Sequence, residues 1–556
     1  MMNEMKRIII VLVMALACYS AIAGEHLRER VYLSTDKTVY VAGDKVWLSA
    51  FCIDVNTNAL STFSRTAYVE LHSTGGMVQT AKVALESGRG GGELSLPMTL
   101  PTGNYKLLAY TAQSCNETAY DYLLGARTIS VFNTLSADRV DGGVEVLDAM
   151  PAASSAAPAS DGIAIKYSDG EITLVNETPS AVSLSLSIYH DDGIPSPVDP
   201  GLGKFLEGVR NLPPATFTQS RTAEYEGEIV RAHVAGVDAS KIPLLEGCPA
   251  FLSVPSKDFD IYSAPVSSDG TLSFYTDNIL GQKDMVLEIG GIDNDMACHL
   301  ELESPFVDVS VTDIPALGIS PDMTDALALR NMGMQISRAF DADTLYEYIP
   351  YRKNPILTNR CIRYILDDYT RFPLMEEVFV EFIPELRIRK SGGRRDIQVC
   401  MEDSFNTYYF AQGSSLMMMD GVPVFDQEKI IGYDPLLVKS IDIYPFTYFI
   451  GGRSFSGLVN FVTYKGNLPS MKFADNARVL SFQGASVPVA MTGEGMDAAY
   501  PDYRQTILWH PLLSLDAGQS ITLKCKTPAY GGRFEIVAEG LSADCSPAGG
   551  RASIVL

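Results

Sequence analysis

Short runs of alternating or continuously apolar residues, separated by turn residues, make up most of the chain. Between residues 29 and 133, seven such runs occur at the spacing of a β-sandwich: 31–34, 45–52, 67–72, 78–85, 93–96, 105–110 and 127–132. Further runs of the same kind occur between 163 and 289 and again between 506 and 555. The pattern predicts a mainly β protein with several β-sandwich domains of the immunoglobulin-like type.

Two segments have helical periodicity instead. In residues 322–340, Asp322 and Asp325 precede apolar residues at helical intervals, which is typical of a capped amphipathic helix. A shorter helix is expected at 375–382, before Pro384. From there to Gly466, strand runs alternate with glycine-containing turns, so we expect an α+β domain.

These patterns, together with shifts in composition, divide the chain into nine segments. We expect a signal peptide at 1–23, a β-sandwich at 24–133, an Ala/Ser/Pro linker at 134–160, a β segment at 161–221, a second sandwich at 222–305, a helical connector at 306–371, the α+β domain at 372–466, a linker at 467–505 and a β unit at 506–556. Strands from elsewhere in the chain could complete the last unit.

Composition and charge narrow the functional class. With 46% apolar and 20% charged residues, the chain can bury several cores and is not of the disordered class. Its net charge of −24 disfavours nucleic acid and anionic lipid as partners. After the first thirty residues no uncharged apolar stretch reaches the length of a spanning helix, so no transmembrane segment is expected in the mature chain.

The first residues have the features of an export signal. Lys6 and Arg7 precede the apolar stretch 8–17, and the small residues before Gly24 match a signal-peptidase site. Lipidation at Cys18 is the alternative processing event. We therefore expect an exported protein that resides in the periplasm, at the outer membrane or on the cell surface.

Eight cysteines remain after removal of the signal peptide, and an even number in an exported chain favours disulfides. Eight thiols allow 105 pairings, and the spacing selects none of them. Because most consecutive cysteines fall within one predicted domain, sequential pairing is the hypothesis. The four candidate pairs are Cys52 with Cys115, Cys248 with Cys298, Cys361 with Cys400, and Cys525 with Cys545.

Catalytic and metal-binding patterns are weak. The six histidines are scattered, and the acidic pairs at 293–295 and 341–343 lack the glycine and closing glutamate of a calcium loop. Ser34 and Lys37 have the spacing of a serine–lysine nucleophile but fall on a strand and turn. The glycine-rich stretch 88–92 lacks the lysine of a phosphate loop and predicts a turn. We expect no metal, no cofactor and no enzyme activity; a hydrolase assembled from distant carboxylates is the catalytic alternative.

Two sandwich segments resemble known modules. Residues 31–47, which include Thr35-Asp36-Lys37 and the turn at Gly43, together with residues 100–107, resemble a macroglobulin-like domain of the alpha-2-macroglobulin type. The thioester motif of the protease-trapping members is absent, since Pro249 follows Cys248. Residues 222–305 resemble transthyretin-like, carboxypeptidase-regulatory-like modules, which are usually non-catalytic spacers.

Four ordered motifs at 375–387, 418–424, 434–444 and 456–466 resemble the plug domain of TonB-dependent outer-membrane receptors. The motif residues are Asp420, Gly421, Asp434, Pro435 and Gly457. In such receptors the apical plug loops touch substrate. This resemblance makes the loop residues Tyr448, Gly451, Gly452 and Arg453 the candidates for ligand binding.

The position of the plug-like segment departs from that of a receptor. A receptor barrel needs several hundred residues after its plug, whereas only residues 467–556 follow here. The combination of modules resembles large envelope proteins of Gram-negative bacteria. The leading hypothesis is a non-enzymatic exported scaffold of the cell envelope whose plug-like domain docks to an outer-membrane partner. The alternative is a substrate-capture accessory of TonB-dependent nutrient uptake.

Overall fold

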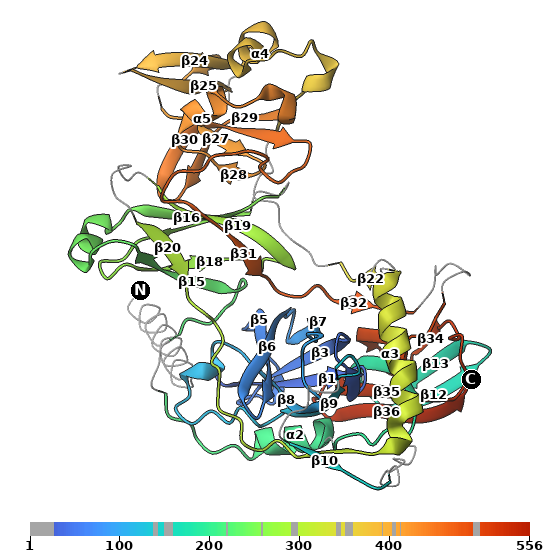
Figure 1. Ribbon diagram of the computed structural model, residues 1–556. Coiled ribbons are helices and arrows are strands. Elements are labelled where there is room, and N and C mark those ends of the chain that lie inside the picture. Colours follow the sequence, from blue (N-terminus) through green and yellow to red (C-terminus); the bar gives the residue numbers. More distant parts are fainter. Residues whose placement is uncertain are drawn as a thin grey trace, which may run out of the picture. The chain divides into compact units, whose positions relative to one another are not determined.

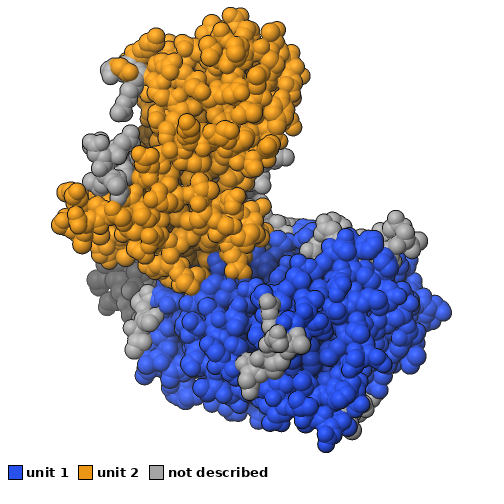
Figure 2. All heavy atoms as spheres, viewed as in Figure 1, with its two compact units in different colours: residues 1–225, 306–351, 485–556 blue, residues 226–305, 352–484 orange. Residues whose placement is uncertain are grey.

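The computed structural model describes residues 27–556 except 137–142, 150–159, 199, 218–220, 257–259, 291–297, 341–345, 351–359, 392, 403–406, 412 and 493–500. The predicted signal peptide and most of the Ala/Ser/Pro stretch lie outside the described residues. The chain divides into two compact units, which the two colours of Figure 2 distinguish. Unit 1 comprises 1–225, 306–351 and 485–556, and unit 2 comprises 226–305 and 352–484.

The first sandwich of unit 1 contains the seven strands predicted between 29 and 133, and the prediction is confirmed. One sheet contains β1 (Glu29–Thr35), β3 (Lys45–Asp54), β4 (Ala59–Leu60) and β7 (Arg89–Ser95). The other has the order β2 (Val39–Val41), β9 (Arg127–Phe132), β8 (Gly103–Tyr110), β5 (Thr66–Ser73), β6 (Gly76–Ala84). Side chains from both sheets form one buried apolar core.

The glycine-rich stretch 88–92 is a turn only at its start. Gly88 has a φ of +77°, but the following glycines belong to β7. A Cβ on Gly91 would lie 2.9 Å from the Pro511 ring, and one on Gly92 would lie 2.9 Å from Ser486 Cβ. The glycines are therefore needed for the close approach of a distant segment to β7, which corrects the turn prediction.

The second sandwich of unit 1 joins two segments that the sequence analysis treats separately. One sheet has the order β11 (Ser160–Asp161), β36 (Pro547–Val555), β35 (Arg533–Ser542), β14 (Val182–Asp191), β33 (Thr506–Leu515). The other has the order β12 (Ile163–Ser168), β13 (Glu171–Asn176), β34 (Ser520–Lys524). Because β14 lies between β33 and β35, residues 160–191 and 506–556 form a single domain.

A buried carboxylate fastens the two sandwiches of unit 1 to each other. Asp36, with 0% exposure, accepts hydrogen bonds from Tyr40 Oη (2.8 Å), Trp47 N (3.0 Å) and Lys37 Nζ (3.1 Å). From the second sandwich, Thr506 Oγ1 donates to the same carboxylate at 2.5 Å. The Thr-Asp-Lys motif therefore has a structural role, because its carboxylate is saturated by groups from three strands and a turn.

The expected helical connector is an assembly of short segments around one helix. The predicted helix is confirmed as α3 (Thr324–Ala339). β10 (Val144–Val146) pairs in parallel with β21 (Leu317–Ile319), and β22 (Glu347–Tyr348) pairs with β32 (Val489–Ala490). A further helix, α2 (Gly201–Arg210), packs its apolar face against the first sandwich. Within the described residues, no helix is long and apolar enough to cross a membrane.

Unit 2 begins with a third sandwich. Its sheets have the orders β18 (Thr271–Tyr275), β15 (Ile229–Ala235), β20 (His299–Leu302) and β17 (Asp260–Pro265), β16 (Pro249–Val254), β19 (Gln282–Ile289), β31 (Arg478–Gln483). β31 comes from the expected linker 467–505, and Phe482 of this strand packs into the sandwich core. The linker prediction is therefore corrected for these residues.

The rest of unit 2 is an α+β domain, here called the 362–474 domain (Figure 1). Its five-stranded sheet has the order β23 (Ile362–Ile365), β29 (Val438–Ile450), β30 (Arg453–Thr463), β27 (Leu416–Met419), β28 (Val422–Pro423). A second sheet has the order β24 (Leu386–Ser391), β25 (Arg394–Glu402), β26 (Tyr408–Phe410). The predicted helix 375–382 is confirmed as α4 (Met375–Phe382), and α5 (Gln427–Ile431) follows β28.

We predict that Asp36→Ala destabilises unit 1 by roughly 3 kcal/mol or more, because the buried Lys37 ammonium would lose its ion-pair partner and three other donors would lose their acceptor. Urea unfolding measures the change. Glu207→Ala, at an exposed position of α2, is the matched control and should stay within about 0.5 kcal/mol of the parent protein. An Asp36→Ala protein as stable as this control would contradict the role assigned to the carboxylate.

A second prediction concerns pH. Burial raises the pKa of the Glu288 carboxyl on β19 from 4.5 to about 7, and Lys429 offsets this only in part. The folded state therefore holds this proton more tightly than the unfolded state, so its contribution to stability is complete below pH 4.5 and is lost as pH rises through 7. Glu288→Gln should raise the free energy of unfolding of unit 2 by roughly 2 kcal/mol at pH 8 and leave it unchanged at pH 4.

Urea unfolding at a series of pH values checks this expectation. Glu303→Gln, at an exposed position in unit 2, serves as the control and should leave the pH profile of the parent protein unchanged. Equal effects of Glu288→Gln at both pH values would show that burial of the charge is not the cause.

Candidate functional site

The β29–β30 hairpin carries the four residues predicted to bind ligand. The two strands join through Gly451 (φ +59°) and Gly452 (φ +70°), and Ile450 pairs with Arg453. Two consecutive positive φ values are those of a type I′ turn, which matches the twist of antiparallel strands and favours glycine at both positions. The sequence at this turn is therefore explained by hairpin geometry.

The side chains around this turn point in different directions. Tyr448 packs inward with Phe455 and Leu416. A Cβ on Gly451 would lie 3.0 Å from the Phe251 ring of β16, so this side of the turn rests on the third sandwich. Gly452 and Arg453 are exposed, as is Phe449 at 80%. The structure thus divides the predicted group, leaving two of its four members on the solvent side.

The predicted motif residue Asp420 holds a turn in place through its hydrogen bonds. It occupies the β27–β28 turn with a φ of +49° and is 4% exposed. Its carboxylate accepts from Thr463 N and Oγ1, both at 2.7 Å, and from Leu468 N at 2.9 Å. Gly421 follows at a φ of +85°, and a Cβ there would lie 2.6 Å from the Ser256 carbonyl oxygen. The Asp-Gly pair therefore anchors the turn.

The other motif residues also shape the backbone. Asp434 caps the short helix η6 (Pro435–Leu437) by accepting from Leu436 N at 2.9 Å. Gly457 has a φ of +86°, and a Cβ there would lie 2.5 Å from Val399 Cβ on β25. Gly457 thus allows β30 to pass directly against β25. The residues that carry the plug resemblance therefore have structural roles in this domain.

The exposed large apolar side chains of the 362–474 domain are not evident from the sequence alone. Nine are exposed among the described residues: Ile365, Tyr369, Leu374, Val380, Tyr408, Tyr409, Leu436, Phe449 and Tyr464. A sequence signal existed, since several occupy positions where strand alternation or helical periodicity calls for polar residues. Without the fold, however, the solvent side of each element could not be assigned.

Several of these side chains gather at one end of the domain. Tyr369 stacks on Phe382 with ring centroids 4.3 Å apart, and Tyr464 Oη donates to Asp367 at 2.6 Å. Arg371 Nη2 donates to the Pro435 carbonyl oxygen at 2.6 Å. These contacts bring η5 (Leu366–Asp368), η6 and the end of β30 together. We call the exposed residues here, Tyr369, Leu374, Leu436 and Tyr464, the apolar end patch.

Unit 1 contains a cavity of about 370 Å³ lined by several cations. Each buried cation is already paired: Arg330 with Asp192 at 2.5 and 2.9 Å, Arg504 with Asp502 at 2.8 and 2.9 Å, and Lys37 with Asp36 at 3.1 Å. Burial raises the pKa of Asp44 in the same wall, and the pKa of Asp192 is lowered by Arg330 against the opposing effect of burial. The buried cations of the lining are therefore neutralised within the protein, which gives these ion pairs a structural role.

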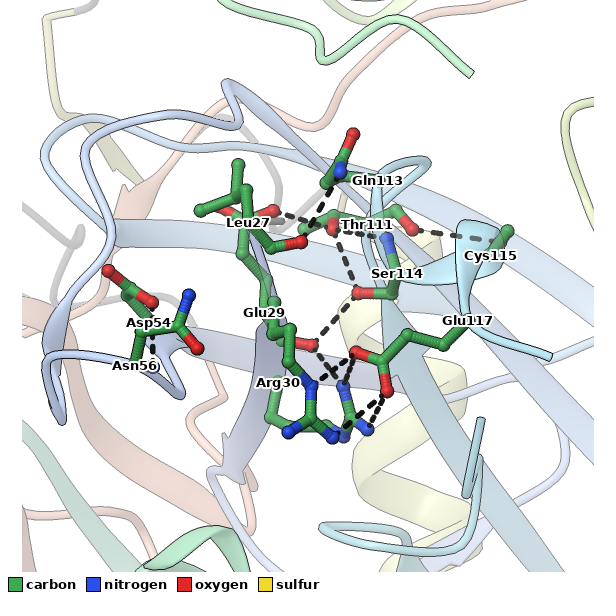
Figure 3. A network of polar contacts seen from close by, with 11 residues as sticks. Leu27, Glu29, Arg30, Asp54, Asn56, Thr111, Gln113, Ser114, Cys115 and Glu117 are labelled. Carbon is green, nitrogen blue, oxygen red and sulfur yellow. Dashed lines mark hydrogen bonds and ion pairs between the residues drawn. The ribbon is translucent and has the colours of Figure 1, made fainter. Parts of the chain in front are cut away.

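A second charged network lies around the start of β1 (Figure 3). Arg30 donates from both terminal nitrogens to Glu117 at 2.8 Å, and Arg28 donates to the same carboxylate at 3.2 and 3.3 Å. Although burial opposes it, hydrogen bonding from these arginines lowers the pKa of Glu117. Glu29 lies beside the network and accepts from Thr111 Oγ1 at 2.7 Å. These acids are saturated by fixed donors, which is the pattern of a structural network.

The Ser34–Lys37 spacing does not produce a nucleophile pair. Ser34 accepts from Ser185 Oγ at 3.0 Å, while Lys37 Nζ donates to Asp36 and, at 3.5 Å, to Thr506 Oγ1. None of these hydrogen bonds joins the serine to the lysine. The two residues instead link the two sandwiches of unit 1.

The described histidines do not converge on one site. His72 is buried against Glu70, whereas His233 and His299 both lie beside Glu301 on the surface. Burial lowers the pKa of His510 to about 4. In the part of the chain that the structure describes, no three metal-binding side chains converge. His26 and the acidic pairs at 293–295 and 341–343 lie outside the described residues.

All eight predicted disulfide partners are free thiols in this structure. The fold explains most of the result. Cys52 belongs to the core of the first sandwich, while Cys115 packs with a tyrosine cluster. Cys525 lies in the core of the second sandwich, and Cys545 occupies a turn. Cys248 and Cys298 do share a core, but as free thiols.

No protein-family model and no curated protein matches the chain. Among solved structures, trypsin-activated alpha-2-macroglobulin of Escherichia coli matches at 10% identity and a TM-score of 0.23, covering 95% of this chain and 41% of that one. Salmonella alpha-2-macroglobulin reacted with methylamine matches at 9% identity and a TM-score of 0.24, with 95% and 39% covered. The adhesin InvE of Yersinia pseudotuberculosis matches at 12% identity and a TM-score of 0.14, with 47% and 55% covered.

The chain thus spans about two fifths of the length of the macroglobulins that it matches. TM-scores this low do not establish a common architecture. The fold described above therefore stands on the observed strand pairing.

The role of Gly457 yields a prediction. Gly457→Ala should destabilise unit 2 by roughly 3 kcal/mol, because the new Cβ would overlap Val399 and the residue would keep a positive φ. Gly466→Ala, also at a positive φ but with no atom within 4 Å of the new Cβ, should cost only about 1 kcal/mol. Thermal and urea unfolding of both variants measure the difference; equal losses would contradict the close crossing of β30 and β25.

Proposed function

We propose that the chain is a non-enzymatic interaction scaffold, exported to the cell envelope, whose 362–474 domain docks to an outer-membrane protein partner. The observation that carries the proposal is the exposure of large apolar side chains on this domain. Nine of the exposed side chains belong to residues 362–474, while eleven are spread over the much longer unit 1. Such a concentration on one domain supports a surface there that another protein covers.

The energetic reason is solvation. Covering apolar surface stabilises a complex by roughly 25 cal/mol per Å² that leaves water, before the costs of association are subtracted. The apolar end patch combines Leu374 (59% exposed), Leu436 (52%) and Tyr464 (51%) with Tyr369 stacked on Phe382. Aromatic groups that are held in place lose little conformational entropy on binding, which makes them suitable anchors.

Unit 1 serves in this proposal as the platform. Its buried acids and bases are saturated by one another, as the pairs Arg330–Asp192 and Arg30–Glu117 show. The net charge of −24 keeps the chain from anionic lipid and nucleic acid and favours a protein partner. Substrate capture by the β29–β30 turn has weaker support, because Tyr448 points inward and Gly451 rests on Phe251.

Site-specific photo-crosslinking tests the proposal. A photoreactive phenylalanine analogue replaces Leu436 or Tyr464 in the full chain, and two exposed positions of unit 1, Val198 (91%) and Val555 (82%), carry the same analogue as controls. In intact cells we expect the two end-patch positions to give one discrete adduct with an outer-membrane protein. The two controls should not give this adduct.

The outcomes separate the proposal from its rivals. Identical adducts from all four positions would indicate non-specific proximity and contradict docking through the 362–474 domain. Absence of adducts at the end patch, with a discrete adduct at either control, would place the partner on unit 1. A protein that fractionates into the cytoplasm would contradict the exported role.

A further inference from the structure

A second surface of the 362–474 domain has a different chemistry. β24 forms one edge of the sheet β24-β25-β26, and within the described residues no strand pairs with its outer side. In Figure 1, β24 and β25 lie with α4 at the end of unit 2 farthest from β15. An edge strand offers unpaired backbone N–H and C=O groups to any extended polypeptide that meets it.

The side chains of this edge strand are basic although the chain as a whole is acidic. Arg387, Arg389 and Lys390 are exposed on β24, whereas the net charge of the whole protein is −24. Arg387 and Arg389 are two residues apart, so they share one face of the sheet, about 6.6 Å apart along the strand. Opposite them on β25 are Gln398 and Asp396. At these four paired positions the face carries two arginines and one acid.

Arg387 is held in position by its neighbours. Its Nε donates to Gln398 Oε1 at 3.0 Å, and Gln398 Nε2 in turn donates to the Ala411 carbonyl oxygen at 3.1 Å. The guanidinium carbon lies 3.9 Å from the centroid of the Phe410 ring on β26. Stacking and the Nε bond fix the plane of the group, while the residue stays exposed. A guanidinium fixed in this way presents its terminal nitrogens in the fork geometry that matches a carboxylate.

Charged residues on an edge strand also discourage aggregation, and a mobile lysine is sufficient for that purpose. The contacts of Arg387 with Gln398 and Phe410 go further, because they pre-organise the cation and so reduce the entropy lost on binding. A free strand edge and a fixed arginine on the same strand together specify an extended acidic peptide.

We propose that β24 binds an extended acidic segment of a protein partner as an additional strand, with carboxylates two residues apart facing Arg387 and Arg389. The proposal rests on the proposed scaffold function and adds the chemistry of the partner. Backbone hydrogen bonds to the free edge provide the pairing, and the two arginines select acidic side chains on one face. An anionic polysaccharide or membrane would use the arginines but not the edge.

Binding of a synthetic peptide tests this proposal. The probe is a fluorescein-labelled peptide, Thr-Glu-Val-Glu-Val-Glu-Val-Thr, and fluorescence anisotropy measures its dissociation constant with the full chain at low and at physiological ionic strength. We expect saturable binding that weakens with salt. Arg387→Gln should weaken it by roughly tenfold or more, since a charge-assisted bidentate contact is lost. Lys439→Gln, at an exposed position of β29, is the control and should bind like the parent protein.

A chemical variant of the probe separates strand addition from simple charge attraction. The same peptide N-methylated at alternate amides keeps its charge but cannot pair along the methylated side. Two such peptides, methylated on opposite sets of amides, should differ: one should lose binding and the other should retain it. Phe410→Leu should weaken binding by about threefold without shifting the urea midpoint of unit 2, because it removes only the stacking that positions Arg387.

The proposal would be overturned by absence of saturable binding, by equal binding of Arg387→Gln and the parent protein, or by equal binding of the two methylated peptides. Tighter binding of polyphosphate or heparin than of the peptide would assign the surface to an anionic polymer instead. If the peptide does not bind but the Tyr464 position still gives the outer-membrane adduct, only this inference is rejected. If the Tyr464 position gives no such adduct, the docking function itself is rejected.

Discussion

The pairing of β14 with β33 on one side and β35 on the other is the constraint on which the rest of the fold depends. It joins residues 182–191 to residues 506–542, and the closure of so long a loop must be offset by contacts made at its base. The apolar core of the second sandwich supplies most of that stabilisation. Asp36 then adds directional bonds, because its carboxylate accepts from the first sandwich and from Thr506.

The same long-range pairing encloses unit 2 within the sequence of unit 1. Unit 2 is inserted in sequence between parts of unit 1, and it returns through β31, which completes the sheet of the third sandwich. Within unit 2, the 362–474 domain packs closely on the third sandwich, where Gly421 lies against Ser256 and Gly451 against Phe251. Because these contacts lie on one side of the 362–474 domain, its outer elements can expose apolar and basic side chains. The end patch is apolar, whereas β24 is basic in an otherwise acidic chain. The two surfaces of this domain are therefore chemically distinct.

Local patterns were enough to predict much of the fold. The seven strands of the first sandwich and helices α3 and α4 follow from period-two and period-3.6 alternation, which depends only on near neighbours. The pairing of strands across hundreds of residues does not follow from such local patterns. The sequence therefore predicts a linker where β31 lies and assigns the strands of the second sandwich to two separate segments. The motif residues Asp420 and Gly457 are evident in the sequence, but their roles are not. Asp420 binds Thr463 and Gly457 lies against Val399, and the sequence does not place these partners beside them.

The predicted binding group shows the same limit. Tyr448 and Gly451 were chosen by resemblance, and the fold turns them toward the protein interior. The sequence does not reveal the fixed Arg387, because Gln398 and Phe410 meet it only across the sheet.

The organisation into two interleaved units is tested most directly by hydrogen-exchange mass spectrometry in rising urea. Residues 160–191 and 506–556 should lose protection together, and residues 229–302 should lose theirs together with 478–483. Loss of protection in 506–556 at a lower urea concentration than in 160–191 would contradict it.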